Sequence, residues 1–198
     1  MPTPQEIAEK LIPQLEARHF SAEYVATAAE AKEAVLKRIP RGAAVMAGSS
    51  TTLDQIGVTD ALKSGEWDYL RAKVWAEQDP AKRQELRMHA MLAPFFLGSV
   101  AAVTEEGILV AADHGGSRVA GYVAGPERVI IVVSTSKVVS DLHDAMRRVR
   151  DVAAPREQER VDKGPVHYAS HPNKWVLLEG EPRAGRTHVI LVGEPLGF

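Results

Sequence analysis

Hydrophobic positions near the start of the chain recur at helical spacing. Within 5–18, Ile7, Leu11 and Leu15 fall on one side of a helix. Pro13 interrupts this register, because proline lacks the amide hydrogen that the interior of a helix needs. The pattern therefore favours two short helical turns over one continuous helix.

A second helix has a clear start and stop. The extended segment 24–26 precedes it and predicts a short strand. Thr27 and Glu30 form the pattern of a capping box, in which each side chain satisfies a free amide at the helix start. Apolar residues continue at helical spacing as far as Ile39, and Pro40 then stops the helix.

Further along, short apolar runs separate segments of helical spacing. Strands are predicted at 43–47, 95–103, 108–111, 129–133, 175–178 and 188–192, and helices at 80–92, 117–123 and 138–149. The pattern assigns no element to the region that holds Trp67 and Trp75, and it predicts an irregular loop over 154–171. The continuous β-branched run at 129–133 is typical of a strand that is buried on both faces.

Strands that alternate with helices predict an α/β fold. We expect an open, mainly parallel sheet with helices on both faces. The length of 198 residues suits one domain, in which residues 1–42 lead into a core at 43–198.

The composition argues against several classes of function. The formal net charge is −2 and the basic residues form no stripe, so no nucleic acid is expected as a partner. The longest apolar stretch, 92–103, is interrupted by Pro94 and is too short to cross a membrane. The first residues lack the pattern of a signal peptide, so the cytoplasm is the expected location. Without cysteine, the chain has no thiolate nucleophile and no cysteine ligands for an iron–sulfur cluster.

Polar residues follow three of the predicted strands, where open α/β sheets bind their ligands. The first group is Gly48, Ser49, Ser50, Thr51 and Thr52. Glycine lets the backbone approach a ligand, and the amides and hydroxyls at a helix start suit a phosphate or carboxylate. The alternative is a glycine turn followed by ordinary helix-capping residues.

The second group runs from Asp113 to Arg118. Arg118 is suited to a bidentate clamp on a carboxylate, and His114 is suited to proton transfer near neutral pH. Gly116 and Ser117 would bring the backbone close to the same ligand. The alternative is structural: Asp113 caps the next helix and pairs with Arg118.

The third group includes Ser136 and Lys137, and it follows the buried strand at 129–133. Lys137 would add positive charge to the same cleft, whereas the structural alternative is an N-cap for the next helix. If the three groups converge, Gly48, Ser49, Arg118 and Lys137 should line one cleft.

Weaker signals point to other chemistry. Glu105 is a candidate carboxylate nucleophile, although acidic residues before a glycine commonly form an exposed turn. His167 and His171 have a spacing compatible with metal ligation but lack a third ligand nearby, so no metal is expected. The chain contains no phosphate-binding or dinucleotide-binding glycine motif, and no cofactor is expected.

Taken in order, several segments resemble the lactate-utilisation (LUD) family, close to its LutC/YkgG branch. The resemblance rests on 48–53 (GSSTTL), 96–110 (FLGSVAAVTEEGILV), 118–126, 148–155 and 189–198 (VILVGEPLGF). It implies a fold related to the NagB/RpiA/CoA-transferase group. It also implies a role in bacterial oxidation of lactate to pyruvate, alongside partner subunits that carry iron–sulfur clusters.

The chain departs from the family pattern at three places. The segment 113–118 (DHGGSR) stands where Asp-Gly-x-Gly-Asn-Arg is expected, and Ser136 stands where asparagine is common. A cysteine-rich segment of many relatives is replaced by 164–171 (GPVHYASH). A metal-linked or redox function that depends on those thiols is therefore not expected here.

Three functional hypotheses follow. The first is an accessory subunit of a system that oxidises L-lactate to pyruvate, with a lactate-like or pyruvate-like carboxylate held by the Gly48 loop, Arg118 and Lys137. The second is a stand-alone acyl or CoA transferase that uses Glu105, by analogy of 104–107 (TEEG) with the motif of CoA transferases. The third is a metabolite sensor without chemistry of its own.

Overall fold

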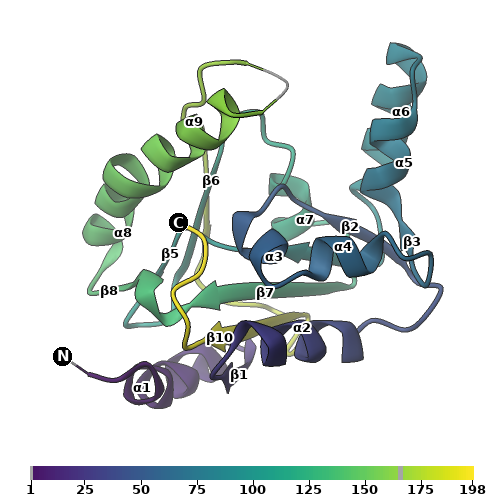
Figure 1. Ribbon diagram of the computed structural model, residues 1–198. Helices are drawn as coiled ribbons and strands as arrows, with labels where there is room; N and C mark the ends of the chain where they lie inside the picture. The colour runs from purple at the N-terminus through teal and green to yellow at the C-terminus, as the bar shows by residue number, and fades with distance from the viewer. Residues whose placement is uncertain (1, 165–166) are drawn as a thin grey trace.

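The structure, a computed structural model that describes residues 2–164 and 167–198, is α/β with two sheets (Figure 1). The larger sheet has six parallel strands in the order β1-β10-β7-β4-β2-β3. Its strands are β1 Ser21–Val25, β2 Ala44–Ala47, β3 Asp68–Tyr69, β4 Phe95–Gly98, β7 Arg128–Ser134 and β10 Thr187–Val192. The predicted α/β fold with an open, mainly parallel sheet is confirmed.

A second, smaller sheet was not predicted. It has the order β8-β5-β6-β9, and β6 runs antiparallel to both of its neighbours. Its strands are β5 Ala102–Thr104, β6 Leu109–Asp113, β8 Val138–Val139 and β9 Lys174–Leu178.

Helices connect the strands and cover the outer faces. They are α1 Pro4–Ala17, α2 Ala28–Lys37, α3 Thr51–Gln55, α4 Val58–Leu62, α5 Leu70–Ala76, α6 Pro80–Ala90, α7 Val119–Val123, α8 Leu142–Arg148 and α9 Ala154–Asp162. A 3-10 turn, Thr135–Lys137, follows β7, and a π-helical segment, Val149–Ala153, joins α8 to α9. None of the helices in the described ranges is both long and apolar enough to span a bilayer.

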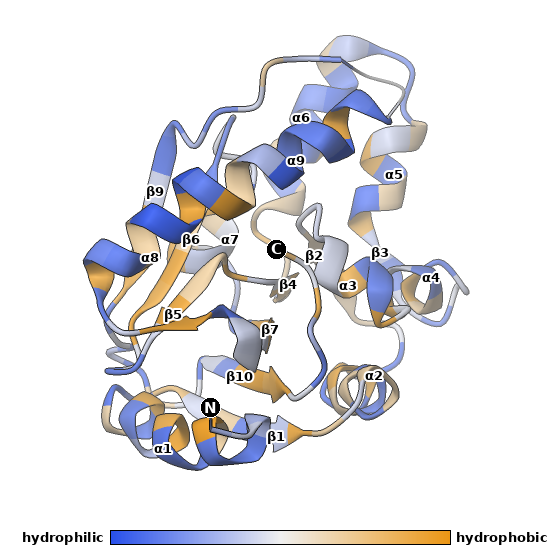
Figure 2. Ribbon diagram, turned by 60° about the vertical axis from the view of Figure 1, so that its left-hand side comes forward, coloured by the Kyte–Doolittle hydropathy of each residue, from blue (hydrophilic) through white to orange (hydrophobic). Residues whose placement is uncertain are grey.

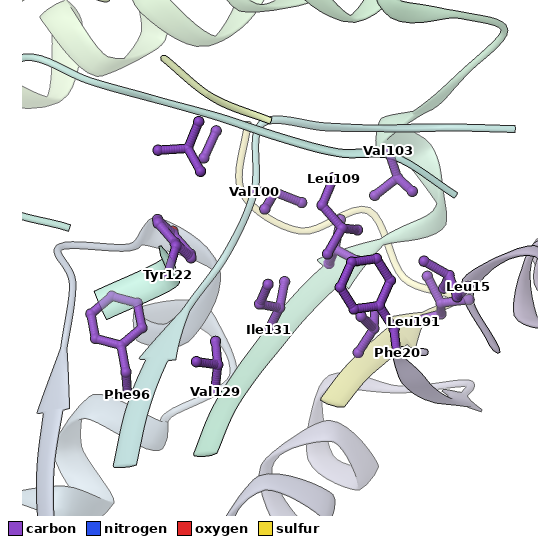
Figure 3. Packing of buried hydrophobic residues seen from close by; sticks show 14 of the residues in the cluster. Leu15, Phe20, Phe96, Val100, Val103, Leu109, Tyr122, Val129, Ile131 and Leu191 are labelled. Carbon is purple, nitrogen blue, oxygen red and sulfur yellow. The ribbon is translucent and has the colours of Figure 1, made fainter. Parts of the chain in front are cut away.

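The two faces of the parallel sheet are buried by different partners. Alternate residues such as Ile130 and Val132 pack with α2, α3 and α4. The opposite face, which includes Ile131, packs with α1 and with the second sheet through Val103 and Leu109 (Figure 3). The expectation of helices on both faces is confirmed, and the second sheet covers part of one face in addition.

The outer face of the second sheet is covered by α8 and the π-helical segment. Ala145 and Val149 face Ala102 and Val110 across this layer. Figure 2 shows that α8 and α9 carry both hydrophobic and hydrophilic residues along their length, as expected for helices with one buried side. The layers are therefore helix, parallel sheet, second sheet and helix.

Three helical expectations need correction. Pro13 lies inside one continuous helix, α1, with its side chain exposed, while Leu11 and Leu15 on the other side of the helix are buried. The helix predicted at 138–149 starts later, because Val138 and Val139 pair with β5 as β8. The loop predicted over 154–171 contains α9, and residues 165 and 166 of that range lie outside the described residues.

The apolar run 95–103 also differs from its prediction. It contains two strands rather than one, because the chain turns at 99–101 and passes from the parallel sheet to the second sheet. Tyr122 Oη donates to the carbonyl oxygen of Ser99 at 2.6 Å, inside this turn. The region of Trp67 and Trp75, which had no assigned element, contains β3 and α5.

Candidate functional site

A cavity of about 820 Å³ opens at the carboxyl ends of β2 and β4. After β2 the chain moves outward to β3, and it then returns to β4 on the other side of β2. Such a reversal of strand order leaves a crevice between neighbouring strands, where open α/β sheets bind ligands. Helices α5 and α6 stand on one side of the cavity and α9 on the other (Figure 1).

Residues 48–52, the Gly48 loop, line this cavity directly after β2. The Gly48 amide donates to the carbonyl oxygen of Leu97 at 3.1 Å, which ties the loop to the end of β4. Ser50 caps α3 by accepting from the amide of Leu53 at 3.3 Å. Thr51 lines the cavity, and its Oγ1 atom is buried without a hydrogen-bond partner among the described residues. The loop is thus both a helix cap and a cavity wall.

Arg118 crosses directly over Gly48. A Cβ atom added to Gly48 would lie 2.5 Å from Arg118 Cδ, so only glycine leaves room for the arginine. Arg118 Nε donates to Asp113 Oδ2 at 2.7 Å, and Arg118 Nη2 donates to the carbonyl oxygen of Ala112 at 2.6 Å. The predicted pairing of Asp113 with Arg118 is therefore confirmed, whereas Asp113 does not cap α7, and Arg118 lines the cavity at the same time.

The Asp113 carboxylate holds both Arg118 and the turn that follows β6. Its Oδ1 accepts from the amides of Gly116 and Ser117, at 2.5 and 3.2 Å. Burial opposes the ionisation of Asp113, but Arg118 and the two amides outweigh it and hold the pKa of the carboxyl below its usual value. The carboxylate is therefore charged at neutral pH and fixes the position of the guanidinium.

Lys137 reaches the cavity from the 3-10 turn after β7 and is only 1% exposed. Its Nζ lies 3.1 Å from Thr52 Oγ1, 3.3 Å from Ser99 Oγ and 3.4 Å from the carbonyl oxygen of Val100. Burial, reinforced by the positive charges of Arg148 and Arg118, lowers the pKa of Lys137 to about 7. A substantial fraction of this amine is therefore neutral at physiological pH.

Positive charge dominates the cavity wall. Among the described residues that line it, the basic side chains are Arg71, Arg83, Arg87, Arg118, Lys137 and Arg160, and the side-chain carboxylates are Asp113 and Glu157. Both carboxylates are already paired, Asp113 with Arg118 and Glu157 with Arg160. This excess of cations favours an anionic ligand.

Comparison with known proteins agrees with the motifs in the sequence. The LUD domain family matches residues 8–192. The chain belongs to this family. Membership relates this LUD-domain protein, at the level of the family, to lactate utilisation.

A solved structure supports the fold of the LUD-domain protein. A DUF162 family protein from Deinococcus radiodurans is similar with a TM-score of 0.59 at 17% sequence identity. The likeness covers 97% of this chain and 99% of that one. At this identity the comparison supports the fold alone, and no curated protein matches the chain.

Most of the candidate site residues of the LUD-domain protein lie together. Gly48, Ser49, Arg118 and Lys137 all line the cavity, as the positions after the strands suggested. One feature differs from the expectation. Asp113 ends β6, which belongs to the second sheet rather than to the parallel one. The end of β6 therefore lines the cavity together with the carboxyl ends of β2 and β4.

Three candidates are not among the residues that line the cavity. Glu105 is exposed on the turn between β5 and β6, whose Gly107 packs against α1. Ser136 is exposed and contacts Ser134 Oγ at 2.8 Å. Gly116 has φ +88°, a left-handed conformation that glycine tolerates, and supports the Asp113 turn from outside the cavity.

His114 and His171 lie at the mouth of the cavity. His114 Nδ1 accepts from the amide of His171 at 3.2 Å, and its ring lies 5.1 Å from that of Tyr168. His114 is exposed and meets no carboxylate among the described residues. This position gives His114 access to a ligand, but none of its contacts identifies it as a general acid or base.

The sequence analysis missed several residues of the cavity wall. Arg71 lines the cavity from α5 and donates to the carbonyl oxygen of Ala47 at 3.3 Å. Ser99, which was not a candidate, contacts Lys137 Nζ together with Thr52 of the first polar group. Arg71 lay in the unassigned region, and no local pattern there indicates a ligand.

Proposed function

We propose that this LUD-domain protein binds a small carboxylate of the lactate or pyruvate type and acts as a LutC-like accessory subunit in the oxidation of L-lactate to pyruvate. The cytoplasm is its proposed location, and iron–sulfur subunits are its proposed partners. The family supports the metabolic setting, and the cavity supports the chemistry of the ligand.

The observation that carries this proposal is the excess of cations in the cavity. The two side-chain carboxylates in the wall are neutralised within the protein, so Arg71, Arg83 and Arg87 add positive charge that a ligand can balance. A carboxylate answers this need, because it accepts hydrogen bonds through two oxygens and carries one negative charge.

Arg118 has the geometry to receive such a group. Asp113 and the Ala112 carbonyl oxygen engage its Nε and Nη2, and no protein acceptor among the described residues engages Nη1. The Thr51 hydroxyl, buried in the same wall without a partner, offers a further hydrogen bond. A guanidinium held from one side loses little conformational entropy when a ligand binds from the other.

The first test replaces Arg118 by lysine. Arg118→Lys keeps the charge but loses the planar, two-point geometry, and we expect binding of lactate or pyruvate to weaken by roughly 1.5–3 kcal/mol. Isothermal titration calorimetry with a panel of 2-hydroxy and 2-oxo acids measures the effect. Arg147→Lys is the matched control, because Arg147 is exposed on α8 and pairs with Asp144 away from the cavity.

Thermal unfolding of both variants separates binding from structure. Since Arg118 also holds Asp113, we expect a modest loss of stability in addition to the loss of affinity. A variant that melts much earlier and still binds the acids as the wild type does would show that Arg118 is only a structural partner of Asp113.

A further inference from the structure

Lys137 lines the cavity and carries a nucleophilic amine. The proposed binding function does not use the reactivity of this amine. We propose that Lys137 is a reactive amine that forms a covalent imine with the carbonyl carbon of a 2-oxo acid held in this cavity. The inference rests on the proposed carboxylate-binding function and assigns to the same site a 2-oxo acid and a covalent step.

The surroundings of Lys137 differ from those of a structural lysine. Lysine is almost never fully buried unless it is paired with an acid. Lys137 is 1% exposed, yet it forms no ion pair within residues 2–164 and 167–198. Its Nζ meets two hydroxyls and a carbonyl oxygen, all at 3.1–3.4 Å, which are long contacts for an ammonium group.

The charges around Lys137 favour its neutral form. Arg148, near the end of α8, and Arg118, before α7, both act on it with positive charge. The residues of α1 that face the core are apolar and add no counter-charge. Burial and these arginines hold the pKa of Lys137 at about 7. Desolvation beside other cations is a known way to activate an amine towards a carbonyl carbon.

The hydroxyl pair of Thr52 and Ser99 suits the steps of imine formation. Thr52 Oγ1 donates to Ser99 Oγ at 3.2 Å, and both oxygens lie beside Lys137 Nζ. Hydroxyls both donate and accept, so this pair can hydrogen-bond the amine in either protonation state and relay protons over short distances.

The step balances without a further reactant. The lone pair of neutral Lys137 Nζ attacks the keto carbon, and the carbonyl oxygen takes up a proton to give a carbinolamine. The hydroxyl group then leaves with a proton as one water molecule, and a carbon–nitrogen double bond remains. Nothing is oxidised or reduced, and the carboxylate of the acid stays free to contact Arg118.

Reductive trapping tests this inference. The wild-type protein is incubated with pyruvate and sodium borohydride, which reduces an imine to a stable secondary amine, and the adduct is located by peptide mass spectrometry. We expect one adduct per chain, on the peptide that contains Lys137. Lys137→Arg should abolish it, whereas Lys174→Arg should not, because Lys174 is exposed and donates to the Gly115 carbonyl oxygen.

Parallel experiments separate this inference from the binding proposal. Pyruvate that binds by calorimetry but gives no adduct on Lys137 would overturn the imine and leave the binding proposal standing. Equal trapping of acetaldehyde, which lacks a carboxylate, would support the reactive amine and contradict carboxylate recognition. Neither binding nor trapping would overturn both. The peptide map of the wild type decides the outcome even if Lys137→Arg fails to fold.

Discussion

At the scale of single residues, the site depends on a few side chains that fit around one another. Gly48 is buried and leaves the space that the aliphatic part of Arg118 fills. Arg118 is then oriented by Asp113, which the amides of Gly116 and Ser117 hold in place. The guanidinium is thus positioned before any ligand arrives, which reduces the entropy cost of binding.

Gly48→Ala should disturb the site through this contact. The new Cβ atom would lie 2.5 Å from Arg118 Cδ and 2.7 Å from Arg118 Cγ, so the arginine must move. We expect acid binding to weaken at least about tenfold and stability to fall by roughly 1–3 kcal/mol, as overpacking commonly does. Calorimetry and chemical denaturation measure the two effects.

Gly115→Ala is the matched control. A Cβ atom at Gly115 meets nothing within 4 Å, and its backbone is not left-handed. We expect near wild-type binding and stability from this variant. Equal losses from both glycine variants would contradict a specific role for the contact between Gly48 and Arg118.

Lys137 makes stability depend on pH in a predictable direction. Its folded pKa of about 7 lies below the ordinary 10.5, so between these values the unfolded chain holds a proton that the folded chain has released. The free energy of unfolding therefore rises with pH across this window. Below about pH 7 both states are protonated, and the cost of burying the ammonium is fully present.

Lys137→Met removes this cost. We expect the variant to exceed the wild type in stability by roughly 2–5 kcal/mol near pH 6, with a smaller gap towards pH 10. Urea denaturation at several pH values measures the gap. Lys174→Met, which replaces an exposed lysine, should show no such pH dependence. A gap for Lys137→Met that stays constant from about pH 6 to pH 10 would contradict a lowered pKa.

At the scale of elements, helix α2 depends on both local capping and tertiary packing. Helix α2 begins at a capping box in which Thr27 Oγ1 accepts from the Glu30 amide at 3.2 Å, and the Glu30 carboxylate accepts from the Thr27 amide at 2.9 Å. Its buried residues, Ala31 and Val35, then face the parallel sheet. Local hydrogen bonds define where the helix begins, and burial of its apolar side stabilises it.

Thr27→Ala should cost about 1 kcal/mol of unfolding free energy, because one amide at the start of α2 loses its acceptor. Chemical denaturation measures the loss. Ser64→Ala is the control, since the Ser64 hydroxyl accepts only a long hydrogen bond of 3.4 Å in an exposed turn. A cost for Thr27→Ala no greater than that for Ser64→Ala would mean that packing alone holds this end of α2.

At the scale of the whole molecule, the charge distribution is uneven. The chain as a whole carries a formal net charge of −2, while cations outnumber carboxylates in the cavity wall. Overall charge therefore says little about the ligand. The local field above the carboxyl ends of β2 and β4 decides which molecules are attracted.

Ligand binding should weaken as salt rises, because dissolved ions screen the attraction between the cavity and an anion. We expect the affinity for pyruvate to fall several-fold between about 20 and about 200 mM sodium chloride, a range over which the Debye length drops well below the size of the domain. Titrations at constant pH measure the slope. An affinity that does not change with salt would argue against an electrostatic basis for recognition.

The sequence by itself determined the α/β class, the central strand and the three polar groups of the site. Each is a local property: a continuous β-branched run at 129–133, a glycine followed by hydroxyl residues at 48–52, and Arg118 shortly after two glycines. Such patterns are readable because neighbouring residues in the chain remain neighbours in a strand or turn.

Only the tertiary structure decided the second sheet and the character of Lys137. The run 95–103 is apolar except at Gly98 and Ser99, and the turn at 99–101 is held by a distant partner, Tyr122. The cations of α5 and α6 join the site because these helices stand beside the cavity. The sequence places Lys137 at the site, but its lowered pKa comes from burial and from two arginines that the fold brings near it. Burial and electrostatic fields are properties of the packed chain, and the order of the residues alone does not reveal them.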